Sequence, residues 1–190
     1  MTSNTIDLGV GTDTIKFTTA TTADTVTVTS STIAGAKTLI FEKAASAPVL
    51  TTGAGADDLV FKAAVSGAGA ISTNSGNDSI QFLESAAFTG AADLGAGADS
   101  VYGANVISNS TISGAAGRDT FLISTLSNAA IYGGSDKDSV NITGSLYGAT
   151  IDFGAGNEIF SLTVGATNST IAGGEGNDTF LVATSDLATA

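Results

Sequence analysis

The sequence predicts an all-β protein, a parallel β-solenoid of about nine coils with about 20 residues per coil. The first observation is a Gly-rich turn that recurs along the chain, with its clearest copy in Gly173–Val182, GGEGNDTFLV. The second is an apolar alternation after each turn, such as Phe180 and Val182, which is typical of a strand with one buried face. The third is that one such unit cannot bury its apolar face alone, so the units must stack.

Two landmarks keep the same register along the chain. The turn copies are Gly9–Phe17, Gly53–Phe61, Asn74–Phe82, Gly95–Tyr102, Ala115–Ile123, Gly133–Ile142, Gly154–Leu162 and Gly173–Val182. The apolar residues expected before the turns are Ile6, Val26, Leu50, Ile71, Ala92, Ile112, Ile131, Ile151 and Ile171. Seven positions later stand Asp13, Asp57, Asp78, Asp99, Asp119, Asp138, Glu158 and Asp178. A chance bias in composition would not hold two landmarks in register.

A third apolar position is expected in the other half of each coil. Its members are Val65, Phe88, Val106, Leu126, Leu146 and Val164. Each repeat is therefore a strand, a Gly-rich turn, a second strand and a looser turn. The inward side chains should form one continuous narrow core.

One coil departs from this pattern. Residues 26–49 form an irregular second coil with a longer loop, and Lys37 stands where the other coils carry an acid. We expect this turn to bind no cation, with Lys37 supplying a positive charge between the turns of Asp13 and Asp57. No linker is evident, so residues 1–190 are expected to form a single domain, and the two interpretations that stay open are a complete protein and a fragment of a longer one.

Composition excludes several classes of protein. The net charge is −12, which argues against nucleic acid or an anionic membrane surface as a partner. With no Cys and no His, the chain has no thiol chemistry, no ordinary zinc site and no His-based acid–base catalysis. No apolar run is long enough to cross a membrane, so we expect no membrane insertion. The first residues do not read as a signal peptide.

The chemistry of the turns points to a hard cation. Glycine permits positive φ and a close approach of the backbone, which lets turn carbonyls point inward. Stacked turns present carbonyl and carboxylate oxygens at one spacing, and flexible oxygen sites suit Ca²⁺. Carboxylates stacked about 5 Å apart repel by roughly 1 kcal/mol per pair in water-like surroundings. Cations between the turns, or carboxyl groups pointing into solvent, would relieve that cost.

The pattern G-G-x-G-x-D-x-apolar-x resembles the nonapeptide of the RTX, or hemolysin-type calcium-binding, repeat family. The match is close at Gly173–Leu181 and degenerate elsewhere, where Thr52, Thr73, Leu94 and Phe153 replace the first glycine and Asp136 a later one. The resemblance implies Ca²⁺ as the ligand. It places the metal at Asp57, Asp78, Asp99, Asp119, Asp138, Glu158 and Asp178, with Gly55, Gly76, Gly97, Gly117, Gly156 and Gly176 in the turns.

Family members usually carry two nonapeptides per coil, whereas half-coils such as Ile123–Ala130 lack the motif here. We therefore expect a single, partly occupied calcium column. The alternative is that the aspartates only form hydrogen bonds within the turns.

We expect no enzyme. The carboxylate pairs Asp57–Asp58 and Asp136–Asp138 lie on repeat turns, and Tyr102, Tyr132 and Tyr147 stand at different positions of the coil. The expected function is a calcium-stabilised structural module outside the cell, in a bacterial surface layer, an adhesin or a secreted RTX-type protein. The alternatives are a phage virion protein (a fibre or decoration protein) and an accessory module of a secreted enzyme. Uncapped ends would contact other copies or neighbouring domains.

Overall fold

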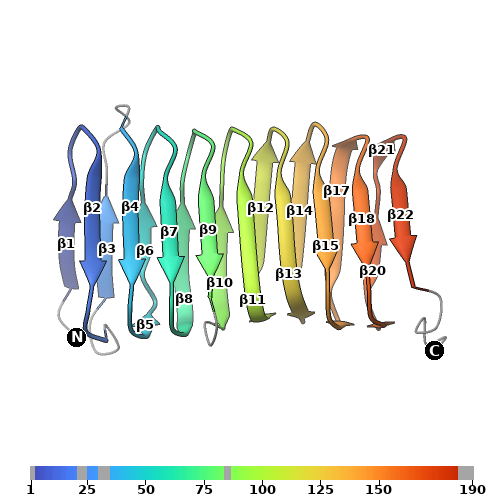
Figure 1. The fold of residues 1–190 in the computed structure, drawn as a ribbon, viewed down its shortest axis with the longest axis horizontal. Coiled ribbons are helices and arrows are strands. Elements are labelled where there is room, and N and C mark those ends of the chain that lie inside the picture. Colours follow the sequence, from blue (N-terminus) through green and yellow to red (C-terminus); the bar gives the residue numbers. More distant parts are fainter. Residues whose placement is uncertain (1–2, 21–24, 30–34, 84–86, 184–190) are drawn as a thin grey trace.

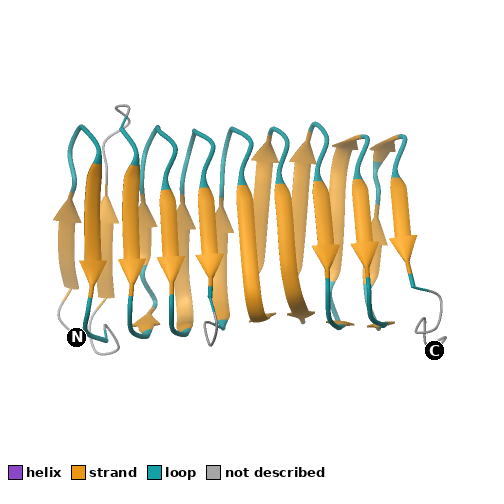
Figure 2. Cartoon of the chain, in the orientation of Figure 1, coloured by secondary structure: helices purple, strands orange, loops and turns teal. Residues whose placement is uncertain are grey.

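The structure is a computed structural model, and it describes residues 3–20, 25–29, 35–83 and 87–183. Within these ranges the chain is all-β, with no helix (Figure 2). The strands stack side by side along one axis, and the first and last coils lie at opposite ends of the stack (Figure 1). Every pairing between coils is parallel, as a solenoid requires.

Strands of the front row follow the Gly-rich turns. They are β2 (Asp13–Phe17), β4 (Lys37–Phe41), β7 (Asp58–Phe61), β9 (Ser79–Phe82), β11 (Ser100–Ser108), β13 (Thr120–Ser127), β15 (Ser139–Ile142), β18 (Ile159–Leu162) and β22 (Thr179–Val182). Each of these front-row strands is one rung of the solenoid, and from the first rung to the last the chain makes about 8 turns of about 20 residues. The prediction of about nine coils counted the rungs rather than the turns that they enclose.

Strands of the back row precede the Gly-rich turns. They are β1 (Ser3–Asp7), β3 (Thr25–Thr29), β6 (Val49–Thr51), β8 (Val65–Ser72), β10 (Phe88–Asp93), β12 (Thr111–Ala116), β14 (Ala130–Ser135), β17 (Thr150–Gly156), β20 (Thr170–Ala172) and β21 (Glu175–Gly176). Along the edge opposite the Gly-rich turns lie the short strands β5 (Ala45–Ser46), β16 (Leu146–Tyr147) and β19 (Ala166–Thr167).

The core is one continuous column of apolar side chains between the two rows, and each inner coil contributes several of them. On the front row the predicted inward pairs of the inner coils, such as Leu59 and Phe61, are fully buried, whereas Ile15 and Phe17 at one end and Phe180 and Val182 at the other are not. Phe17, Phe41, Phe61 and Phe82 stack ring on ring, with centroids 4.4, 4.8 and 5.2 Å apart. This spacing matches the distance between paired strands, so the rings stack at the same repeat as the backbone ladder.

The structure corrects three of the expected apolar positions. In the second coil Ile6 pairs with Val28 rather than Val26, and Val28 in turn pairs with Leu50. On the edge, Ile107 and not Val106 is in line with Phe88 and Leu126. Ala166 replaces Val164, which is 41% exposed. The remainder of the expected loop of the second coil, residues 30–34, lies outside the described residues.

The inward position of Ile107, where Val106 was expected, has a structural reason. Gly103 occupies an inward position between Phe82 and Ile123 and leaves a gap in the core. The Cδ1 atom of Ile107 lies 2.9 Å from where a Cβ of Gly103 would stand. Ile107 therefore fills the gap that the glycine leaves.

Candidate metal centre

The acidic residues of the turns are buried inside the solenoid. We call Asp57, Asp78, Asp99, Asp119, Asp138, Glu158 and Asp178 the carboxylate column. From Asp57 to Glu158 these residues are at most 2% exposed, and the last member, Asp178, is half-buried. Each stands where a back-row strand has turned over into the front row, and its side chain points inward. The idea that these carboxyl groups avoid one another by pointing into solvent is therefore wrong.

Backbone hydrogen bonds hold the column in register. The amide of Asp57 donates to Oδ1 of Asp78 at 2.8 Å, and the amide of Asp78 to Oδ1 of Asp99 at 2.7 Å. The same bond joins Asp99 to Asp119 at 2.9 Å and Asp119 to Asp138 at 2.8 Å. One oxygen of each of these aspartates thus accepts a hydrogen bond from the preceding coil, so the observed bonds join successive coils and do not lie within a turn as the alternative to calcium supposed.

The other oxygen of each aspartate has no partner. Oδ2 is buried and accepts no hydrogen bond of ordinary geometry in Asp57, Asp78, Asp99, Asp119 and Asp138, and the same holds for both carboxylate oxygens of Glu158. The hydroxyl groups of Thr52 and Thr73 lie close enough to Asp57 and Asp78 to lower the pKa values of these two carboxyl groups, but they do not reach hydrogen-bonding geometry. Glycines make room for some of these atoms, because a Cβ at Gly114 would lie 2.2 Å from Oδ2 of Asp119 and one at Gly133 2.4 Å from Oδ2 of Asp138. A buried carboxylate oxygen without a partner favours a proton or a cation beside it.

Burial changes the acidity of the column. It raises the pKa of Asp78 to about 6 and the pKa values of Asp99 and Asp138 to about 7, although the amide donors of the preceding coils oppose the shift. Burial also raises the pKa values of Asp57 and Asp119. Neighbouring carboxylates add to the increase at Asp78, Asp99 and Asp138. The ionised column is therefore costly without a compensating charge.

Glu158 breaks the regular ladder. Both of its oxygens lack a hydrogen bond, whereas its own amide still donates to Oδ1 of Asp178 at 3.2 Å. Burial raises the pKa of Glu158 to about 7, and the carboxylate of Asp178 adds to the effect. The extra methylene of glutamate carries the carboxylate past the position that accepts the amide of the preceding coil.

The turn before each column residue has a repeated backbone shape. The residues four and two positions before Asp57 are Gly53 and Gly55, with φ of 92° and 146°. Asn74 and Gly76 have the same left-handed shape, and so do Ala115 and Gly117. Even the departures from the glycine pattern, Asn74, Ala115 and Asp136, keep positive φ. Positive φ thus recurs at these turn positions, with the exception of Gly156, two positions before Glu158.

The predicted turn glycines lie where the backbones of successive coils touch. A Cβ at Gly76 would lie 1.9 Å from the carbonyl oxygen of Gly55, and one at Gly97 1.4 Å from that of Gly76. Gly117 and Gly176 face the carbonyls of Gly97 and Gly156 in the same way. Gly156 faces the carbonyl oxygen of Asp136 in the same way, with its missing Cβ at 2.0 Å, and that Cβ would also meet the carboxylate of Glu158 at 2.1 Å. These glycines are first of all a requirement of stacking.

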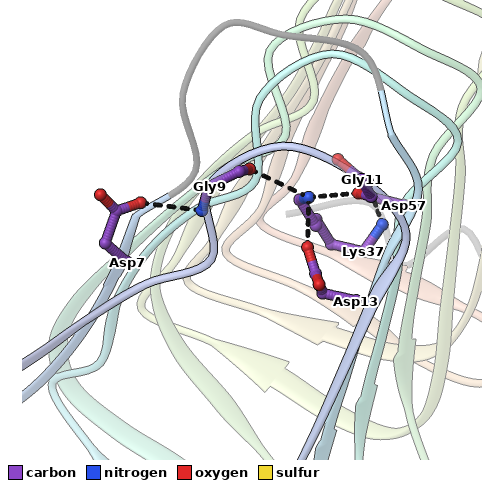
Figure 3. Close-up of polar contacts among 6 residues, drawn as sticks. All are labelled: Asp7, Gly9, Gly11, Asp13, Lys37 and Asp57. Carbon is purple, nitrogen blue, oxygen red and sulfur yellow. Dashed lines mark hydrogen bonds and ion pairs between the residues drawn. The ribbon is translucent and has the colours of Figure 1, made fainter.

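In the first turn a lysine supplies the missing positive charge (Figure 3). The Nζ of Lys37 donates to Oδ2 of Asp13 at 2.7 Å, to the carbonyl of Gly11 at 2.5 Å and to that of Gly9 at 3.2 Å. The backbone amide of Lys37 donates to Oδ1 of Asp57 at 2.6 Å. Lys37 thus keeps the backbone role of a column residue, while its side chain reaches back into the first turn. The prediction of a positive charge between Asp13 and Asp57 is confirmed.

The residues fit a hard cation by their chemistry. In the first turn two carbonyls and one carboxylate oxygen surround an ammonium, and later turns carry the same carboxylate with an unpaired oxygen. Oxygen donors of this kind are the ligands that Ca²⁺ prefers. Among the described residues no three acidic side chains converge on one point. A metal would therefore depend on backbone carbonyls as much as on carboxylates.

No known protein family, curated protein or solved structure matches the chain. The resemblance to the RTX nonapeptide thus rests on the turn residues alone. In the part of the chain that the structure describes, no helix is long and apolar enough to cross a membrane.

Sequence reasoning found the column but not its surroundings. It named the column aspartates and the glycines two positions before them, and the structure places each pair in one turn. It placed the charge of Lys37 near Asp13 but missed the carbonyl oxygens of Gly9 and Gly11 as its other partners. The available signal was the spacing, since Gly9, Gly11 and Asp13 repeat the offsets of Gly53, Gly55 and Asp57.

Proposed function

We propose that the chain is a non-catalytic, calcium-stabilised structural module that works outside the cell, as part of a bacterial surface layer, an adhesin or a secreted RTX-type protein. The observation that carries the proposal is the row of buried carboxylate oxygens without partners in Asp57, Asp78, Asp99, Asp119 and Asp138. A solenoid whose turns need cations is stiff where calcium is plentiful and loose where it is scarce.

Calcium would be held by the carboxylate column and by the carbonyls of the turn before each member. The metal supplies positive charge to carboxylates that are already out of water. The protein supplies one carboxylate per coil at a fixed repeat, together with turn carbonyls held by left-handed residues such as Gly53 and Gly55. Folding and metal binding are then coupled, because the unfolded chain does not bring successive turns together.

Calcium should raise the melting temperature of the wild-type chain by about 10 °C at pH 8, relative to metal-free buffer. The reason is that the metal binds only to stacked turns. Circular dichroism at the strand signal measures the transition, with millimolar magnesium as a control, since magnesium fits flexible oxygen sites less well. Identical melting curves with calcium and without it would refute the metal proposal and leave the solenoid unaffected.

A matched variant separates a metal site from general salt effects. Asp119→Asn keeps an oxygen that can accept the amide of Asp99, but it removes one buried charge. This variant should melt higher than wild type in metal-free buffer and gain less from calcium. A calcium effect as large as that of wild type would exclude Asp119 as a ligand.

The ends of the solenoid support a partner of the same fold. In the last described rung Phe180 is 44% exposed, whereas Phe160 in the rung before it is fully buried. Stacking of another coil on β22 would cover Phe180 and continue the parallel ladder.

We expect sedimentation velocity to detect larger species as the protein concentration rises. Phe180→Arg should suppress this association, because it places a charge on the face that stacks. Leu122→Arg is the control, since Leu122 is 37% exposed on β13 in the body of the solenoid. Equal association of both variants and wild type would refute end-to-end stacking.

A further inference from the structure

Lys37 is among the largest fully buried side chains in the described part of the chain, with an exposed fraction of 0%. A buried lysine is rare unless its charge is matched by partners. Its ammonium has three, the carbonyl oxygens of Gly9 and Gly11 and the Oδ2 of Asp13. All three belong to the first turn, so the side chain leaves its own coil and fills the turn before it (Figure 3).

The oxygens around the ammonium follow the pattern of the later turns. Gly9 and Gly11 have φ of 60° and 106°, the left-handed pair that Gly53 and Gly55 repeat before Asp57. The carbonyl of Gly11 also lies against the next coil, 2.1 Å from where a Cβ of Gly35 would stand, as the carbonyl of Gly55 does against Gly76. The first turn therefore has the same stacking contact and the same shape as the later turns.

The first turn differs from the later turns in the group that lies beside its aspartate oxygen. Oδ2 of Asp13 receives the ammonium of Lys37, whereas the equivalent oxygens of Asp57, Asp78 and Asp99 receive no hydrogen bond. The aspartate that would stand in the column at the second coil is replaced by a residue whose own charge neutralises Asp13.

We propose that Gly9, Gly11 and Asp13 form a cation site that the chain fills with its own ammonium, so that the first turn closes without metal. The inference rests on the proposed function only in treating the later turns as calcium sites. The two N-terminal coils are then a metal-independent start for the solenoid, from which the calcium-dependent coils continue.

The decisive experiment replaces the internal cation with a ligand. Lys37→Asp restores an acid to the column and removes the ammonium, so it should bind one more calcium per chain than wild type, counted by equilibrium dialysis. Lys37→Met fills the same space without charge and should bind no additional calcium. Lys62→Asp is the charge-matched control, because Lys62 is an exposed lysine whose Nζ pairs with Glu42 at 2.9 Å.

The outcomes separate this inference from the proposed function. If wild type binds no calcium and Lys37→Asp binds one, the proposed function fails and the cation site in the first turn is confirmed. If Lys37→Asp binds the same number as wild type, the inference is overturned whatever wild type binds. A Lys37→Asp chain that stays unfolded in calcium while Lys37→Met folds also overturns it.

Hydrogen exchange gives a second readout in metal-free buffer. The amides of Leu39 and Phe41 on β4 should exchange at least about tenfold more slowly than those of Phe160 and Leu162 on β18. The reason is that β4 lies beside the first turn, where Lys37 neutralises Asp13, whereas β18 follows the turn of Glu158, whose carboxylate has no cation beside it in this buffer. Lys37→Met should remove this difference and lower the melting temperature by roughly 10 °C, because it leaves the Asp13 carboxylate without its cation. Equal protection of both strands in wild type would contradict the inference.

Discussion

In metal-free buffer the melting temperature of the wild-type chain should fall steadily as the pH rises from about 4 to about 8. Burial raises the pKa of Asp78 to about 6 and the pKa values of Asp99, Asp138 and Glu158 to about 7. In the unfolded chain these groups lose their protons near their ordinary values of about 4. Between these limits the folded chain holds more protons than the unfolded chain.

The sign of the effect follows from that difference. A group whose pKa is raised by folding stabilises the fold at low pH, and this contribution is lost as the pH passes its folded-state pKa. For Asp99 this contribution is lost between its ordinary pKa of about 4 and its folded-state pKa of about 7. This direction is opposite to ordinary acid denaturation, in which paired carboxylates lose stability as the pH falls.

Calcium should act in the same pH window. It competes with the protons on the column, so its stabilising effect should be large at pH 8 and small at pH 5. Calorimetry at half-unit steps, with calcium and without it, measures both curves. A metal-free melting temperature that is constant or rises between pH 5 and 8 would show that the carboxylates are compensated in another way. Asp99→Asn should flatten the metal-free curve, because it removes one of the titrating groups.

Gly97→Val should abolish the stable fold. A Cβ at this position would lie 1.4 Å from the carbonyl oxygen of Gly76, and the backbone has a φ of 154°. The turn cannot move aside, since Ala96 bonds to the coil before it and Gly97 to the coil after it, at 2.8 Å each. The expected loss is about 5 kcal/mol or more, beyond the range of most single substitutions.

Ala98→Val is the matched control for this substitution. It adds a side chain of the same size at the next residue of the same turn, where the side chain is exposed. Its melting temperature should stay within a few degrees of wild type. The far-ultraviolet circular dichroism of both variants checks the result, and a folded Gly97→Val chain with wild-type stability would show that successive turns are not in close contact.

The sequence was sufficient for the solenoid and for the register of its acids. The equal spacing of Asp57, Asp78 and Asp99 and the alternation after each of them are confirmed by the strand pairings. Both signals are local, because a short turn and a half-buried strand are each encoded within a few residues. The identification of calcium stays a prediction, as does the placement outside the cell.

Where the sequence misled, two residues satisfied the same local pattern. In TVTVT both Val26 and Val28 have the alternation of an inward position, and only the pairing with Ile6 selects Val28. Val106 and Ile107 are adjacent and apolar, and the gap at Gly103 selects Ile107. Val164 lies in the looser turn, where the chain changes direction and the period of two no longer holds.

The sequence by itself determined that the chain coils about every 20 residues and that each coil except the second, which carries Lys37, brings one acid to the same place. Only the tertiary structure decided that the acids face inward, and that in Asp57, Asp78, Asp99, Asp119 and Asp138 one oxygen accepts an amide while the other has no partner. It also decided that Lys37 reaches back into the first turn. The reason is physical. Desolvation, hydrogen bonding and the path of a long side chain depend on neighbours 19 to 28 residues away, which become neighbours only when the coils stack.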